Sequence, residues 1–428
     1  MSLPSALAPS RARTGVGALD SRASRSRRRA LASRSRAAAT PASSDVAFER
    51  AATRRDVLRD AFIASVVVTA AAAMDVGVVR AAKAEDAPAD APAAPATTTK
   101  ARVTLITGAN SGVGYTAAKQ LAAQGRTVVL ACRTAEKGKR AVDEIKAELG
   151  AGADVRALDV GLELGDLRSV REYALEFLSH DFALDALVLN AGIMAAPLER
   201  TVQGHELHFG INHLGHFLLA EALTPALRES RGRVVSVSSL LCMIGDLALD
   251  FDDLDWNARK YDPWYAYGAS KAQNVLFADE FARREGANGI VSNSLHPGIV
   301  TTNLVRYSVP DMVQSNRDLA RERESLAGQL AAKAGIRNPD EGCKTTVWLA
   351  AADEAARVNG KFFVDPGLEY PGATREQLVA AGDWFLVSGT EFLAPQLNYP
   401  AALFTWRDEA NAAKLWATSQ EMVRKFTV

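Results

Sequence analysis

The 428-residue sequence contains little cysteine and has no net charge. Its three cysteines, Cys132, Cys242 and Cys343, share no short metal-binding spacing, so we predict that all three are small apolar core residues rather than parts of a disulfide or metal site. Lys plus Arg and Asp plus Glu both number 50, which leaves no basic footprint for nucleic acid or for an acidic partner. The length allows the core of one large domain or two smaller ones.

The positive charge that is present is concentrated at the start of the chain. Residues 1–44 contain nine arginines and a single acid, Asp20, and Ser and Ala make up most of the remainder. This composition is typical of an organelle transit peptide. A disordered arm that binds nucleic acid is the alternative, but such an arm would not explain the segment that follows.

A second signal follows the first. Arg54-Arg55 precedes an uncharged run over residues 61–74, and Ala82-Lys83-Ala84 supplies a small-x-small cleavage site. The run is shorter than the roughly 20 residues that span a bilayer, so a cleaved signal is favoured over an uncleaved one that holds the protein on a membrane. Two signals in series resemble the bipartite presequence of a chloroplast protein, and residues 1–84 therefore predict delivery to the thylakoid lumen or the thylakoid membrane surface.

The folded part begins after a linker. Residues 85–100 are rich in Ala, Pro and Thr and predict the linker, and residues 101–428 predict one domain. An apolar strand at 102–107 runs into a glycine-rich turn and a helical pattern that reaches Ala123. This order brings backbone N–H groups at a helix N-terminus to a dinucleotide pyrophosphate. The residues expected to line that contact are Gly108, Asn110, Ser111, Gly112, Val113 and Gly114.

The ends of the next two strands carry the residues that distinguish one dinucleotide from another. The strand at 127–132 ends before Arg133, and an arginine in this place suits the 2′-phosphate of NADP, whereas NAD needs an acid that is not found nearby. A solvent-exposed strand end is the alternative. A third strand around Val155 is predicted to end in Asp159 and Val160, and Asp159 is predicted to contact the adenine edge or, alternatively, to cap a helix.

A fourth strand at 186–189 leads into Asn190, Ala191 and Gly192. Small residues at this point let the cofactor lie against the edge of the sheet. We expect the Asn190 side chain to tie neighbouring strands together.

Tyr267 and Lys271 are four residues apart, which places both side chains on one face of a helix. The neighbouring ammonium group is expected to lower the pKa of the phenol, which is ordinarily near ~10. Such a tyrosine can exchange a proton with a substrate oxygen. The pair is a weak signal by itself, because most such pairs are surface neighbours on a helix.

Five motifs occur together over residues 101–364: the glycine turn at 107–114, Asn-Ala-Gly at 190–192, Ser-Ser at 238–239, Tyr-x-x-x-Lys at 267–271 and Pro-Gly at 297–298. In this order and at these separations, the sequence resembles the short-chain dehydrogenase/reductase family. The resemblance implies an α/β fold with a doubly wound parallel sheet. It also implies a homodimer that forms through helices flanking the sheet.

The resemblance assigns four catalytic roles. Tyr267 would be the acid and base, and Lys271 would lower its pKa and hold the nicotinamide ribose. Ser239, at the end of a strand over 233–238, would bind the substrate oxygen, although a helix cap is the alternative role. Asn212 would anchor a water that links Lys271 to solvent, or else be a buried structural amide.

Four further residues would close over the nicotinamide, namely Pro297, Gly298, Thr301 and Thr302.

Two stretches narrow the resemblance. Residues 190–197 and 204–219 are similar to the retinol dehydrogenase-like branch, which includes WW-domain oxidoreductases and a short-chain dehydrogenase of the chloroplast translocon. The second stretch holds His205, His208, His213 and His216. These histidines fall on more than one helix face with no cysteine or acid cluster beside them, so we predict packing residues and no metal.

Two variable segments follow. A lid over 299–336 contains Val300, Leu304, Val305, Val309 and Met312, which favour an apolar substrate unless they only pack the lid onto the core. An insert over 366–407 carries seven aromatic residues: Tyr370, Trp384, Phe385, Phe392, Tyr399, Phe404 and Trp406. A packed cap, a subunit contact, a peripheral membrane contact and additional core are its four interpretations.

These patterns predict an oxidoreductase that uses NADP(H) and acts on a small apolar alcohol, aldehyde or ketone. An NADP-binding regulatory or translocon-associated subunit with little turnover is one alternative. A protochlorophyllide-type reductase is another, but Gln273 stands where that neighbouring family has a cysteine, which counts against it.

Overall fold

The computed structural model describes residues 100–300, 302–304, 336–370, 377 and 405–428. Its contacts divide the chain into Met1–Arg55 and Asp56–Val428, and every described residue belongs to the second unit. The predicted targeting segments, Thr301, most of the 299–336 lid and most of the 366–407 insert lie outside the described residues.

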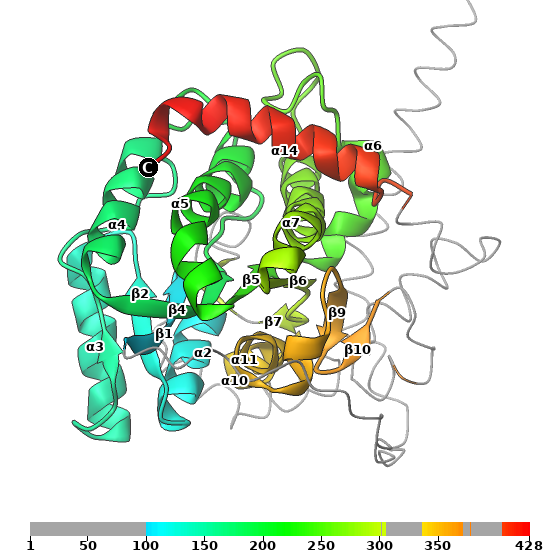
Figure 1. The fold of residues 1–428 in the computed structure, drawn as a ribbon. Coiled ribbons are helices and arrows are strands. Elements are labelled where there is room, and N and C mark those ends of the chain that lie inside the picture. The colour runs from blue at the N-terminus through cyan, green and yellow to red at the C-terminus, as the bar shows by residue number, and fades with distance from the viewer. Residues whose placement is uncertain (1–99, 301, 305–335, 371–376, 378–404) are drawn as a thin grey trace, which may run out of the picture. The chain divides into compact units, whose positions relative to one another are not determined.

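Within the described residues, one eight-stranded sheet has the order β10-β9-β6-β5-β4-β1-β2-β3 (Figure 1). All neighbouring strands are parallel except the β9–β10 pair. The strand order reverses between β1 and β4, which confirms the doubly wound α/β prediction. The strands are β1 Ala101–Thr107, β2 Thr127–Ala131, β3 Val155–Arg156, β4 Phe182–Leu189, β5 Arg233–Val237, β6 Val291–Leu295, β9 Phe362–Asp365 and β10 Leu368–Glu369. A separate parallel pair joins β7 Ile299–Val300 to β8 Ile336–Arg337.

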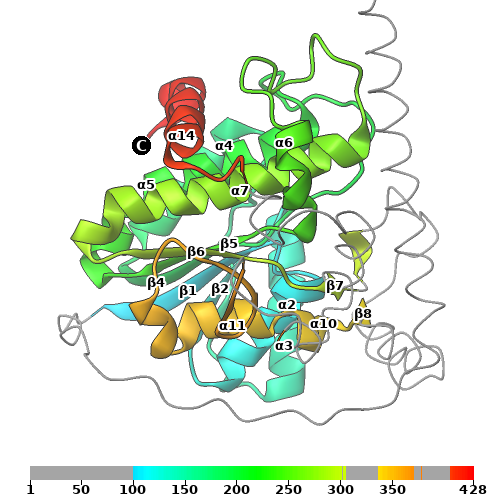
Figure 2. The same ribbon diagram turned by 90° about the vertical axis from the view of Figure 1, so that its right-hand side faces the viewer.

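Helices cover both faces of the sheet (Figure 2). One face packs against α2 Gly112–Ala123, α3 Ala135–Leu149 and α11 Lys344–Ala351, and the short helix α10 Pro339–Gly342 lies against α2. The other face packs against α4 Leu167–Ser179, α5 Gly215–Ser230 and α7 Pro263–Glu285. Because both faces are covered, residues 103–107 of the central strand β1 are all buried.

Shorter helical segments complete the described chain. They are the π-helical η2 Phe209–Leu214, the helix α6 Gly245–Ala248 and the 3₁₀ segments η3 Leu240–Ile244, η4 Gly286–Asn288, η7 Glu354–Arg357 and η9 Arg424–Phe426. The C-terminal helix α14 Glu409–Val423 lies on α7, where the Trp416 ring stacks parallel to Phe277 with centroids 6.0 Å apart.

The start of α7 is set by its sequence. Asp262 accepts hydrogen bonds from the backbone N–H groups of Trp264 and Tyr265, and Pro263 occupies the first helical position. A capping aspartate followed by proline favours a helix start at this point. The start of α7 fixes the direction in which Tyr267, one turn further along, projects.

Several predictions about packing can be compared with the structure. Cys132, Cys242 and Cys343 are all buried and free, as predicted. Tyr370 and Trp406, at the two ends of the insert, belong to a core cluster, so the additional-core interpretation holds for these two aromatic residues. The other five aromatic residues of the insert lie outside the described residues. None of the helices described has the combination of length and hydropathy that crossing a membrane requires.

Candidate active site

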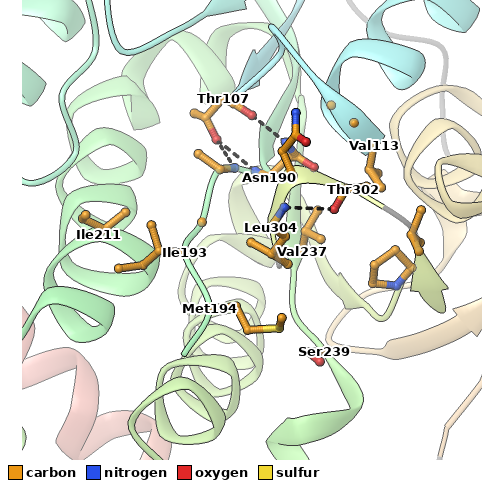
Figure 3. A pocket seen from close by; sticks show the side chains of 18 of the residues that line it. Thr107, Val113, Asn190, Ile193, Met194, Ile211, Val237, Ser239, Thr302 and Leu304 are labelled. Carbon is orange, nitrogen blue, oxygen red and sulfur yellow. Dashed lines mark hydrogen bonds between the residues drawn. The ribbon is translucent and has the colours of Figure 1, made fainter. Parts of the chain in front are cut away.

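A cavity of about 1000 Å³ opens at the carboxyl ends of β1, β4, β5 and β6 (Figure 3). It brings together residues that are far apart in the sequence. The predicted site residues that line it are Gly108, Asn110, Ser111, Gly112, Val113, Gly114, Arg133, Asn190, Ala191, Gly192, Ser239, Tyr267, Lys271, Pro297, Gly298 and Thr302. Asn212, Asp159 and Val160 are not among its lining residues, and Thr301 lies outside the described residues.

The glycine-rich turn forms a cradle that only glycine permits. Gly108 and Gly112 have φ angles of +67° and +57°, a left-handed conformation that side chains disfavour. A Cβ on Gly114 would lie 2.4 Å from Nδ2 of Asn190 and 2.8 Å from the carbonyl oxygen of Gly108. Helix α2 begins at Gly112, and the Ser111 side chain makes no capping hydrogen bond within the described part of the chain. A helix N-terminus with this backbone approach fits a pyrophosphate.

Gly114→Ala is expected to weaken binding of the dinucleotide cofactor at least about tenfold, because the added methyl must displace Asn190 and the Gly108 backbone. Isothermal titration with NADPH measures the change. Gly152→Ala is the matched control, since a Cβ there meets no atom within 4 Å. Equal NADPH affinity in Gly114→Ala and wild type would show that the cofactor does not use this turn.

Asn190 and Thr107 join two strands at the floor of the cavity. Thr107 Oγ1 accepts from the backbone N–H groups of Asn190 and Ala191, each at 2.9 Å, and Asn190 Nδ2 donates to the Thr107 carbonyl at 2.8 Å (Figure 3). The end of β4 is thereby tied to the end of β1, which is the role predicted for Asn190.

Arg133 lies at the cavity with an acid beside it. Its Nε is 3.2 Å from Oε2 of Glu163, and the two side chains are 55% and 40% exposed. The sequence-based inference that no acid lies nearby was therefore wrong, because the loop after β3 brings Glu163 back to Arg133. An ion pair this exposed contributes little stability, about 0–1 kcal/mol.

Asp159 is not among the residues that line the cavity, and its contact with the adenine edge stays a prediction. Its side chain is 85% exposed and pairs with Lys139 at 2.7 Å. Leu158 is buried in the core, so the next side chain points to solvent, and Val160 packs against the same core. The helix that follows is capped by Asp166, not Asp159, so the helix-cap alternative was wrong.

Tyr267 and Lys271 are both buried on α7. Lys271 Nζ donates to the carbonyl oxygen of Val237 at 2.9 Å and lies 5.8 Å from the centroid of the Tyr267 ring. Burial raises the pKa of Tyr267 to about 12, although a hydrogen bond with Ser239 opposes that rise. Burial also lowers the pKa of Lys271 to about 8. The predicted lowering of the tyrosine pKa is therefore wrong for the protein alone, because desolvation of the phenolate dominates.

The two adjacent serines have different contacts. Ser238 Oγ donates to the carbonyl oxygen of Lys271 at 2.6 Å, which commits this hydroxyl to the backbone of α7. Ser239 Oγ accepts from Leu241 N–H at 3.3 Å, so it caps η3, and its hydroxyl is near enough to Tyr267 to lower the pKa of that phenol. Of the two serines, Ser239 is therefore the one beside Tyr267. It also caps η3, so the helix-cap alternative holds as well.

Asn212 lies behind the cavity wall. Its Oδ1 accepts from Ile193 N–H at 2.9 Å, and its Nδ2 donates to the Ile193 carbonyl at 3.0 Å and to Ser270 Oγ at 2.9 Å. These contacts describe a buried structural amide, the alternative interpretation, and the role of Asn212 in anchoring a water stays a prediction.

Each of the four histidines contacts a polar group other than histidine. The partners are Asp255 for His205, Glu206 for His208, Ser419 for His213, and Thr107 for His216. Among the described residues, no three His, Cys, Asp or Glu side chains are grouped so that they could hold a metal ion. The histidines therefore act in packing and hydrogen bonding here.

The cavity also contains residues that the sequence reasoning did not assign to the site. The main ones are Glu163, Ile193, Met194, Leu241, Trp264 and His296. Trp264 precedes Tyr267 by three residues on α7, so helical spacing could have identified it. Glu163 carried no comparable local signal, because its position depends on the path of the loop after β3.

A glycine cradle at α2 and a Ser–Tyr–Lys group at the same sheet edge define an oxidoreductase that uses a nicotinamide cofactor. A family model described as short chain dehydrogenase matches residues 102–249. Human retinol dehydrogenase 13 is 37% identical over 265 residues, covering 61% of this chain and 76% of the relative. Human retinol dehydrogenase 14 is also 37% identical, over 276 residues, covering 62% of this chain and 78% of the relative.

One solved structure is also similar to this chain in sequence and fold. The crystal structure of an uncharacterised protein from Mycobacterium paratuberculosis is 30% identical, with a TM-score of 0.51, and covers 76% of this chain and 94% of that one. The protein belongs to the short-chain dehydrogenase/reductase family, and its similarity to retinol dehydrogenases confirms the predicted branch.

Proposed function

We propose that the protein is an NADP(H)-dependent oxidoreductase that interconverts a small apolar alcohol and the corresponding aldehyde or ketone. The observation that carries this proposal is that Ser239, Tyr267 and Lys271 line one cavity whose nearby wall is apolar. That wall includes Ile193, Met194 and Leu304, which Figure 3 labels, together with Leu240, Leu241, Trp264, Ile299 and Val300. An apolar wall with a few converging polar groups suits an apolar substrate with one reacting oxygen.

The chemistry divides between cofactor and protein. When bound, the cofactor supplies or accepts the hydride. Because burial raises the pKa of Tyr267 to about 12, its phenol is protonated at neutral pH and can donate to a substrate oxygen. Ser239 offers a second hydroxyl to the same oxygen and orients it. Lys271 holds its ammonium group one helical turn away and favours the transient phenolate.

Purified full-length protein should oxidise NADPH in the presence of some apolar aldehydes or ketones. The panel includes retinal, because the two human relatives are named as retinol dehydrogenases, together with shorter alkyl and aryl carbonyls. A sugar aldehyde serves as the polar control. Tight NADPH binding without turnover of any carbonyl would contradict the enzyme proposal and favour a regulatory NADP-binding subunit.

The preference for NADP is proposed to rest on Arg133. Its guanidinium lies at the cavity and is 55% exposed, so it can turn from Glu163 toward a 2′-phosphate and bind it through two N–H groups. Arg133→Ala is expected to raise the Kd of NADPH about tenfold and to leave that of NADH within about twofold. Titration of both cofactors by fluorescence measures this difference.

Arg140→Ala is the matched control, because it removes an exposed arginine that is absent from the cavity lining. If Arg133→Ala weakens NADH as much as NADPH, or weakens neither, Arg133 does not select the 2′-phosphate.

A further inference from the structure

A buried carboxylate outside the proposed chemistry lies close to the site. Glu206 has an exposed fraction of 0%. Its Oε1 accepts from Nδ1–H of His208 at 2.7 Å and lies 3.1 Å from the Tyr261 hydroxyl, and its Oε2 accepts from Phe209 N–H at 2.8 Å. Every oxygen of this carboxylate therefore has a protein donor.

The surroundings of Glu206 keep it ionised. Burial alone would raise its pKa, but the hydrogen bond from His208 and those from backbone N–H groups lower it instead. The Glu206 carbonyl also accepts the first helical hydrogen bond, from Gly210 N–H at 2.7 Å, so the carboxylate lies at the positive end of a helix. A buried charge is retained only when donors surround it in this way.

The partners of Glu206 hold the substrate wall. Ala196 N–H donates to Nε2 of His208 at 3.1 Å, and the Tyr261 hydroxyl donates to the Ala196 carbonyl at 2.9 Å. Ala195, the residue before, has a φ angle of +50°, which a non-glycine residue adopts only when its surroundings enforce it. Met194 and Ala195 both line the cavity. The two hydrogen bonds to Ala196 therefore hold a strained turn of the cavity wall.

His208 and Tyr261 also lie next to α7, the helix that carries the proposed acid Tyr267. The His208 ring packs edge-on against the Tyr267 ring, with centroids 6.2 Å apart. Tyr261 immediately precedes the Asp262 cap of α7. A change at His208 or Tyr261 should therefore affect Tyr267 as well as the Met194–Ala195 wall.

We propose that buried Glu206 and His208, with partly buried Tyr261, form a positioning network that fixes the Met194–Ala195 wall of the substrate site relative to Tyr267. The inference rests on the proposed carbonyl reduction. Ala196 N–H can donate to Nε2 of His208 only if that nitrogen carries no proton, so the imidazole proton lies on Nδ1. Glu206 enforces this tautomer by accepting that proton, and in this way it acts on the wall through His208.

Tyr261→Phe tests the network with the smallest change, since it removes only the hydroxyl that contacts Ala196, Glu206 and His208. We expect kcat/KM for the best carbonyl to fall about tenfold, mainly through a higher KM, because the wall loosens. The Kd of NADPH should stay within about twofold, because the cofactor cradle is at the other end of the cavity. Deuterium exchange of the peptide that spans residues 193–196 should become faster.

Glu206→Gln is the second variant, in case Tyr261→Phe folds poorly. Its carboxamide can still accept from Phe209 N–H, but its NH₂ group then faces His208 Nδ1 and drives the imidazole proton to Nε2, which removes the acceptor for Ala196 N–H. The kinetic and exchange changes should match those of Tyr261→Phe.

Tyr173→Phe is the matched control, because Tyr173 is buried on α4 and its hydroxyl has no hydrogen-bond partner among the described residues. Unchanged KM and unchanged exchange at 193–196 in both network variants would overturn the inference while leaving the proposed function intact. If wild-type protein reduces no carbonyl, the proposed function fails, and the exchange rates alone still decide whether the network holds the wall.

Discussion

Tyr267→Phe should reduce kcat by roughly 10³-fold with carbonyl substrates, within the 10²–10⁴-fold range of general acid catalysis. The variant keeps the buried ring and its contact with His208 but loses the only phenolic proton placed beside Ser239 in the described structure. Stopped-flow or steady-state NADPH oxidation measures kcat, and calorimetric titration should show NADPH binding within about threefold of wild type.

Tyr173→Phe again provides the control, since burial also raises the pKa of this tyrosine and its hydroxyl lies outside the cavity lining. Retention of more than about a tenth of wild-type kcat by Tyr267→Phe would remove the tyrosine from the acid role, because general acids contribute at least ~10²-fold.

Lys271→Met should lower kcat/KM at least about 10²-fold, because the proposed role of this ammonium is to favour the Tyr267 phenolate and to hold the cofactor ribose. Methionine fills a similar volume within a buried helix face without a charge. Steady-state kinetics measure kcat/KM of Lys271→Met, and the value is compared with that of Tyr267→Phe. A double variant that is no slower than the slower single variant would show that the two residues act as one unit.

The same substitution should stabilise the fold at neutral pH. Burial lowers the pKa of Lys271 from 10.5 to about 8, which corresponds to roughly 3 kcal/mol of destabilisation. The unfolded chain binds more protons between these two pKa values, so this penalty is complete below about pH 8 and fades as pH rises toward 10.5. Loss of the hydrogen bond to Val237 offsets about 1 kcal/mol.

Thermal unfolding should therefore give Lys271→Met a higher Tm than wild type at pH 7, and the difference should shrink toward pH 10. A lower Tm at pH 7 would show that Lys271 is better solvated or better paired than its burial indicates. The expected gain in stability with loss of activity is typical of a charged group held in a buried active site.

The sequence by itself determined the features that depend on local backbone and on residue spacing. Gly108, Gly112 and Gly114 predicted the cofactor turn because only glycine allows its conformation and its close approach to Asn190. The four-residue spacing of Tyr267 and Lys271 predicted their shared helix face, and the order of strands and helices predicted the doubly wound sheet. The targeting assignment of residues 1–84 stays a prediction.

Only the tertiary structure decided the properties that depend on burial and on distant neighbours. The loop after β3 placed Glu163 against Arg133 and turned Asp159 to solvent, and neither result follows from the residues adjacent to them. The sign of the Tyr267 pKa shift depended on how completely the fold excludes water from this side chain, since desolvation raises the pKa and Ser239 lowers it. The Glu206–His208–Tyr261 network and its partner Ala196 join three separate segments (196, 206–208 and 261), because hydrogen bonds form wherever the folded chain brings donor and acceptor together.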